Sequence, residues 1–386
     1  MAVTEAVTRP KRDLRLDFFR GLALFLIFID HIPGNFISYF TLRSIGFSDA
    51  AEAFIFISGY AASMVYGALN RQHGFLLALA QIYRRVWQLY VAHVFLFVIY
   101  LAEVSYTLDV ADNPLFAEEM GVGDFLKTPH IAVMQALLLR FQPTFLDILP
   151  LYIVLLAGFP LVLLLLRRHV LLALVPSFAL YVCTQAFGWA LHAYPGEHRW
   201  FFNPFAWQFL FTLGAVCSEL GANRGRPLPT LPWLQFLAFA IAGTGAIVSL
   251  SWLIHSFYDG FPALLVQAFW RGSIDKTNLS PVRLVDFLAL ALVATTIIPR
   301  ESAFFSGKIA RPIVICGQNS LYIFCLGILL AVLGHFVLAV VSDRPAAQIA
   351  VNLAGAAVMI AVGAMITWYK KAGRNRAKAT APGPAG

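Results

Sequence analysis

The chain has 386 residues, of which 60% are hydrophobic and only 12% are charged, and its mean hydropathy is +0.75. Soluble domains carry about 25% charged residues, so the composition excludes an ordinary soluble enzyme and indicates a multi-span membrane protein. The net charge of +8 is spread over loops and both ends of the chain, so it does not indicate a nucleic-acid partner.

Ten apolar segments are long enough to cross a bilayer, which takes about 20 residues. The expected fold class is therefore all-α: a polytopic helical bundle of about ten transmembrane helices, placed at 16–33, 49–69, 83–102, 146–166, 169–187, 204–220, 233–254, 283–299, 314–341 and 347–369. We expect residues 16–369 to form one transmembrane domain between a basic N-terminus, 1–15, and a basic, disordered tail, 370–386.

Basic residues gather at both ends of the chain and in alternate loops. Because cytoplasmic loops carry an excess of Lys and Arg, this pattern places both termini in the cytoplasm. An even number of spans agrees with that orientation.

The first predicted span, LDFFRGLALFLIFIDHIP, holds four ionisable residues: Asp17, Arg20, Asp30 and His31. Eleven positions separate Arg20 from His31, which at about 100° per residue puts both on one stripe of a helix, roughly 16 Å apart along its axis. Ionisable groups inside a membrane usually face protein or water and mark function. We therefore expect this helix to contribute to a site.

The second span begins with Asp49 and Glu52, an i, i+3 pair at its extracytoplasmic end. These acids, together with Asp30, can meet His31 at that surface. A neutral histidine oriented by a carboxylate is a common general base for a hydroxyl proton. Asp30 points about 100° away from its neighbour His31, so Glu52 or Asp49 is the expected orienting partner. Hydrogen-bonded groups at a helix end are the structural alternative.

Arg84 and Arg85 lie where the third span enters from the cytoplasm, in YRRVWQLY. Guanidinium groups bind phosphates bidentately, and they serve equally well as topology anchors.

The outer loops offer residues that could hold a polar acceptor. Trp200, Asn203 and Trp207 could stack on and hydrogen-bond a sugar, although aromatic side chains at a membrane interface explain the same pattern. Lys276 could hold a polar or anionic group. The four cysteines lie in apolar stretches without metal-ligand spacing, so we expect no metal site.

Several blocks of the sequence, among them RLDFFRGLALFLIFIDHIP, GFSDAAEAFIFISGY, FLDILPLYIVLL, FFNPFAWQFLF, DKTNLSPVRL and GQNSLYIFCLG, together resemble the OpgC family. They extend from the first span to the ninth. The resemblance implies transfer of a succinyl group from cytoplasmic succinyl-CoA to osmoregulated periplasmic glucans at the bacterial inner membrane. It implies a catalytic role for His31 and a donor-contacting role for Arg20, with acyl-CoA as a co-substrate and no permanently bound cofactor.

Two other readings remain open from the sequence. One is a proton-coupled transporter or flippase of a glycan or anionic solute, in which His31 and the acids relay protons. The other is a non-catalytic assembly subunit, which the charges within the membrane argue against. The pattern does not decide between direct transfer and an acyl-enzyme intermediate, nor does it give the oligomeric state.

Overall fold

A computed structural model describes residues 13–111, 118–224, 231–258, 260–263, 273–299 and 302–379. Within these ranges the regular structure is helical, with no β-strand. The elements are α1 (Leu14–Asp30), η1 (Phe36–Phe40), α2 (Leu42–Ile45), α3 (Ala50–Ala62), η2 (Ser63–Gly67), α4 (Ala68–His73), α5 (Phe75–Ala111), α7 (Gly123–Lys127), α8 (Pro129–Leu137), α9 (Ile148–Arg168), α10 (Val170–Phe187), α11 (Pro204–Arg224), α12 (Pro232–Phe257), α14 (Pro281–Ile297), η3 (Ala303–Ser306), α15 (Ala310–Gln318), α16 (Ser320–Val340) and α17 (Pro345–Ala379).

The structure confirms the all-α polytopic fold class. In the described part of the chain, 7 helices are long and apolar enough to cross a membrane: Ala50–His73, Phe75–Leu108, Ile148–Arg168, Val170–Phe187, Pro232–Phe257, Ser320–Val340 and Pro345–Gly373. The three other expected spans correspond to α1, α11 and α14. Helices α1 and α14 have 17 residues each, at the lower limit for a span, and both contain charged residues.

Three boundaries differ markedly from the sequence prediction, and the first is that of α5, which extends beyond the expected 83–102 at both ends. The segment 314–341 is not one helix, because the chain breaks between α15 and α16 at Asn319. The Asn319 amide donates to Thr367 Oγ1 at 2.8 Å and accepts from Lys370 Nζ at 2.7 Å, so an amide–ammonium network replaces helix continuity there. Helix α17 continues to Ala379, so the described part of the predicted tail is helical; residues 1–12 and 380–386 lie outside the described residues.

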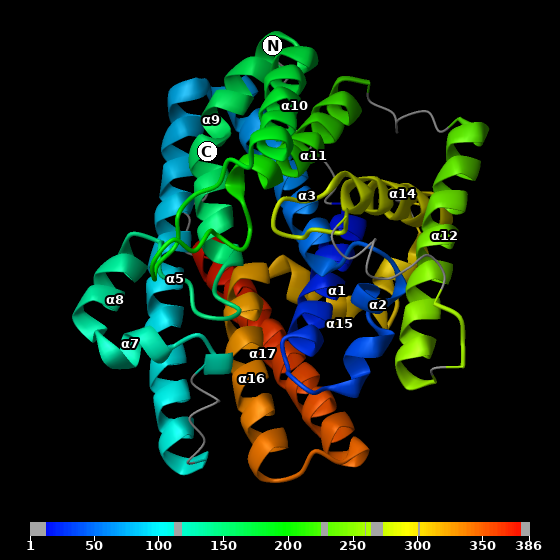
Figure 1. Cartoon of the computed structure of the whole chain (residues 1–386). Coiled ribbons are helices and arrows are strands. Elements are labelled where there is room, and N and C mark those ends of the chain that lie inside the picture. The colour runs from blue at the N-terminus through cyan, green and yellow to red at the C-terminus, as the bar shows by residue number, and fades with distance from the viewer. Residues whose placement is uncertain are drawn as a thin grey trace, which may run out of the picture.

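Helix α1 lies in the middle of the bundle, against α3, α15 and α16 (Figure 1). Glycines make its close contacts possible. A Cβ at Gly21 would overlap the carbonyl oxygen of Ile313 in α15, and one at Gly317 would overlap that of Asp17. Backbones can approach this closely only where both helices present small residues. The helix with the most ionisable groups is therefore fixed on several sides.

The helix that begins at Ala50 changes its winding midway. Residues Ser63–Gly67 form a π-helical turn between α3 and α4. Single π turns inside α-helices occur often at functional sites. Here the turn presents Val65 and Tyr66 to a cavity of about 200 Å³.

Candidate active site

His31 caps the C-terminal end of α1, where its ring is held from two sides. Nδ1–H donates to the carbonyl oxygen of Ile27, one turn earlier in the helix. The ring of Phe145 meets the imidazole edge to face, with 4.4 Å between centroids. Because a carbonyl can only accept, this bond places the proton of the neutral ring on Nδ1. The lone pair of Nε2 is then available to take a proton.

An ion network lies at the N-terminal end of α3. Asp49 is the N-cap and forms a capping box with Glu52. Each of the two side chains accepts a hydrogen bond from the backbone N–H of the other residue. Glu52 Oε1 also accepts from Arg283 Nε at 2.7 Å, and Asp49 Oδ2 accepts from Arg283 Nη2 at 3.1 Å. Lys276 Nζ lies 2.7 Å from Asp49 Oδ2. Two carboxylates and two cations thus join α3 to the chain around α14.

The loop that carries Lys276 is fixed by Trp207 of α11 and by Asn203, the residue before that helix. Trp207 Nε1 donates to the carbonyl oxygens of Lys276 and Thr277, and Asn203 Nδ2 donates to Asn278 Oδ1 at 2.9 Å. Both Trp207 and Asn203 are fully buried. The ammonium group lies 5.4 Å from the centroid of the Phe202 ring, a cation–π distance. The loop therefore holds Lys276 in a defined place while part of its side chain stays exposed.

The fields of Lys276, Asp49 and Arg43 act on both His31 and Asp30. Asp30 Oδ1 accepts from Thr41 Oγ1 at 2.7 Å, which ties the end of α1 to the loop after it. The four residues predicted to meet at this end of the bundle, Asp30, His31, Asp49 and Glu52, are thus gathered there with Lys276.

Two acids just outside the spanning helices differ in pKa. Burial raises the pKa of Asp49, but Lys276 and Arg283 outweigh burial and hold that pKa well below its usual range. For Asp147, which precedes α9 by one residue, burial dominates and raises the pKa to about 6, although Lys276 acts against it. Asp49 is therefore an ionised anchor, whereas the raised pKa of Asp147, about 6, lets that carboxyl titrate in mildly acidic solution.

A second polar region lies nearer the N-terminal end of α1, around Arg20. Arg20 and Arg85 line one cavity of about 200 Å³, together with Ser58, Tyr66, Tyr152 and Ser320 from four other elements. Arg20 Nη2 donates to Ile57 O at 3.4 Å, and Arg85 Nη1 donates to Gln88 Oε1 at 3.2 Å. Two cations from different helices therefore share a space that could hold an anionic or strongly polar group.

Aromatic side chains lie at the end of this cavity nearer the ion network. Phe54, two residues after Glu52, contacts Tyr152 and Phe324, with centroids 6.3 Å and 6.1 Å away. All three line the cavity, and so does Leu149, two residues after Asp147. Among the described residues, His31 does not line it. The cavity thus points toward the elements around His31 and ends before the imidazole.

The structure separates the residues singled out in the sequence into three sets. His31, Asp30, Asp49, Glu52 and Lys276 gather at one end of the bundle, and Arg20 and Arg85 share the cavity. Arg84 is exposed outside the cavity, and Trp200, Asn203 and Trp207 are buried.

Two expectations need correction. The orienting partner of His31 is the Ile27 carbonyl rather than Glu52 or Asp49, because Arg283 and Lys276 occupy those carboxylates. Trp200, Asn203 and Trp207 cannot stack on or hydrogen-bond a sugar in this structure, because all three side chains are buried.

Sequence reasoning missed Phe145 and Asp147 as neighbours of the site. Both belong to the FLDILP block, but neither has a periodicity that relates it to α1. Phe145 has φ 72°, in the left-handed region that non-glycine residues rarely adopt. This backbone conformation directs its ring to His31. No group of three or more His, Cys, Asp or Glu side chains in the described ranges could hold a metal ion.

These features define a multi-pass membrane protein with a polar site at one end of its central helix. Residues 12–371 match the family model described as OpgC protein, so the chain belongs to the OpgC family. Membership supports, in broad terms, an acyltransferase-type role in glucan modification. Searches of curated proteins and of solved structures found no match.

Proposed function

We propose that this protein is a membrane O-acyltransferase that moves a succinyl group from cytoplasmic acyl-CoA to a hydroxyl of a periplasmic glucan at the bacterial inner membrane. The observation that carries the proposal is the state of His31. Its Nδ1–H is engaged by Ile27 O, which leaves Nε2 as the basic nitrogen beside a cluster of charged groups.

The donor would enter by the cavity of Arg20 and Arg85. Guanidinium groups favour phosphate and carbonyl oxygens, so Arg85 suits the nucleotide end of acyl-CoA and Arg20 its extended arm. Arg20 and His31 stand about 16 Å apart on one helix, given 1.5 Å per residue. The arm would pass Phe54 to bring the thioester to the imidazole. The acyl group alone would then cross the bilayer.

In the proposed step, Nε2 of His31 removes the proton of a glucan hydroxyl as its oxygen attacks the thioester carbonyl. The new C–O bond forms, and the resulting oxyanion is stabilised by Lys276, a partly exposed cation whose field acts on His31. Collapse breaks the C–S bond, and the imidazolium returns its proton to the leaving thiolate. Ester and CoA thiol are the products.

The test uses the purified protein in nanodiscs with radiolabelled succinyl-CoA and a periplasmic glucan. We expect labelled glucan and free CoA in equal amounts. Loss of a general base costs typically 10²–10⁴-fold, so His31→Ala should lower kcat by that factor with little change in KM for either substrate. His130→Ala is the matched control, because His130 is an exposed histidine on α8 and should act like wild type.

Retained turnover in the His31→Ala variant would remove the base assignment. Absence of both labelled glucan and free CoA from the wild-type reaction would contradict the acyltransferase itself. A transporter would instead move glycan or succinate across the membrane of a proteoliposome without forming CoA.

A further inference from the structure

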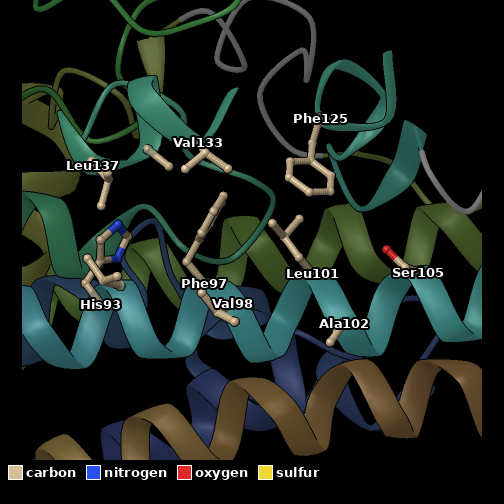
Figure 2. Close-up of a pocket in the computed structure, with 11 residues that line it drawn as sticks. His93, Phe97, Val98, Leu101, Ala102, Ser105, Phe125, Val133 and Leu137 are labelled. Atoms are coloured by element: carbon tan, nitrogen blue, oxygen red, sulfur yellow. The ribbon is translucent and has the colours of Figure 1, made fainter. Parts of the chain in front are cut away.

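A second cavity, of about 360 Å³, lies between α5 and the pair of short helices α7 and α8, away from the site above. Its lining is almost wholly apolar (Figure 2). Phe97, Val98 and Leu101 come from α5, and Phe125 and Val133 come from the short helices. The proposed acyl transfer uses none of these residues.

One polar side chain stands out among them. The lining residues of α5 form a row from His93 to Ser105. His93, at one end of this row in Figure 2, points from α5 toward Leu137 of α8. It is only 1% exposed, and among the described residues neither of its ring nitrogens has a hydrogen-bond partner. A buried polar group without a partner is costly, so native structures usually satisfy it. The neutral ring offers one N–H donor and one acceptor nitrogen. The cavity therefore suits an occupant with an oxygen at this end.

The surroundings indicate where that occupant comes from. Helix α8 exposes Ile131 and Met134, and Leu138, the residue after the helix, is exposed as well. In a membrane protein, apolar side chains exposed in this way lie against hydrocarbon. Trp87 and Tyr90, stacked with centroids 5.7 Å apart, lie less than two turns before His93 on α5. Such aromatics mark the level of lipid headgroups.

The length of the row also fits a lipid. It extends along α5 from His93 to Ser105, which is about 18 Å at 1.5 Å per residue. One leaflet contributes about half of a hydrocarbon core that is roughly 30 Å thick. An acyl chain of one leaflet can thus lie along most of the cavity.

We propose that this cavity binds one bilayer glycerophospholipid. Its acyl chain fills the space between α5 and the α7–α8 pair, and an ester carbonyl oxygen accepts a hydrogen bond from His93. The lipid would hold α8 on α5. Tyr90 Oη already donates to Leu137 O at 2.9 Å beside this position.

The test is native mass spectrometry of the full-length protein, released from nanodiscs of phosphatidylethanolamine and stripped with increasing detergent. We expect wild type to retain one phospholipid per chain at detergent levels that remove the others. His93→Leu, which removes the donor, and Val133→Trp, which fills the cavity, should each lower the retained fraction at least tenfold. Val91→Trp is the matched control, because Val91 is an exposed α5 residue that does not line the cavity.

A second measurement keeps the proposal testable should a variant not fold. Wild-type protein would be irradiated in nanodiscs containing a phospholipid with a diazirine on its acyl chain, and the labelled peptides mapped. Label concentrated in residues 93–105 and 125–137 supports the site. Equal labelling of all lipid-facing helices, or equal lipid retention by His93→Leu and wild type, would overturn it.

Discussion

Arg283 Nε donates to Glu52 Oε1 at 2.7 Å, and this bond joins α14 to the start of α3 across 231 positions of sequence. Both side chains are buried, and Glu52 has no exposed surface. A carboxylate in such a place is stable only beside its cation. Removal of the arginine should therefore cost far more than the loss of one surface ion pair.

We predict that Arg283→Met lowers the free energy of unfolding by about 3–5 kcal/mol, the usual effect of breaking a buried pair on one side. The double variant Arg283→Met with Glu52→Gln should recover part of that loss, because no buried charge then lacks a partner. Thermal unfolding in detergent, followed by tryptophan fluorescence, measures both. Equal destabilisation of the single and double variants would contradict the explanation.

The neighbouring arginines of α5 offer a matched pair. Arg85 lines the cavity with Arg20, whereas Arg84 is exposed outside it. If the cavity receives acyl-CoA, Arg85→Ala should raise KM for the donor about tenfold, equivalent to about 1.4 kcal/mol of lost binding. Arg84→Ala should leave KM within about twofold. Donor titrations at saturating glucan test this prediction, and similar KM values for both variants would move the donor site elsewhere.

Asp147 predicts a pH dependence of stability. Its pKa of about 6 lies above the ordinary value of 3.8 because of burial. Between these two values the folded protein binds more protons than the unfolded chain, so this residue makes unfolding easier as pH rises from about 4 to 6. Above about pH 6 Asp147 is ionised in the folded protein, and its full destabilising effect is present.

Asp147→Asn removes that titration. The variant should match wild type near pH 4 and exceed it by about 1–2 kcal/mol at pH 7, a figure reduced because the side chain keeps some exposure. Urea unfolding of both proteins at several pH values gives the difference curve. A difference that does not change with pH would mean that Asp147 is ionised throughout.

Gly59 is a site of close helix packing. A Cβ there would overlap the carbonyl oxygen of Phe211 in α11, while a Cβ at Gly158 in α9 would meet nothing within 4 Å. We predict that Gly59→Ala destabilises the protein by about 1–3 kcal/mol, as overpacking does. Gly158→Ala should be neutral or stabilising by up to about 1 kcal/mol, because alanine favours a helix. Paired thermal unfolding curves decide this.

Much of this fold follows from hydrophobic length. In the described part of the chain, each of the seven helices that are long and apolar enough to cross a membrane overlaps a segment chosen by length and hydropathy. What composition could not show is where a continuous apolar run breaks. Residues 314–341 read as one span, yet the Asn319 amide finds partners on α17 and the helix ends there. Such tertiary hydrogen bonds have no local signature.

The candidate site was also predictable only in part. Helical periodicity placed Arg20 and His31 on one stripe, and acid spacing brought Asp49 and Glu52 to the same end of the bundle. Phe145 reaches His31, and Asp147 comes near Lys276 and Asp49, by a loop with an unusual backbone angle at Phe145, which periodicity does not encode. The burial of Asn203 and Trp207 depends on the loop of residues 275–280 folding over them, a contact between distant segments.

The π-helical turn at Ser63–Gly67 sets the angular relation between the two halves of one membrane helix. An extra residue in a turn shifts every later side chain by about 100° around the axis. Deleting one residue here would restore uniform winding, but it would swing Arg71 away from Glu219, which it contacts at 3.0 Å. Natural variation in this stretch should therefore favour substitution and disfavour changes in length.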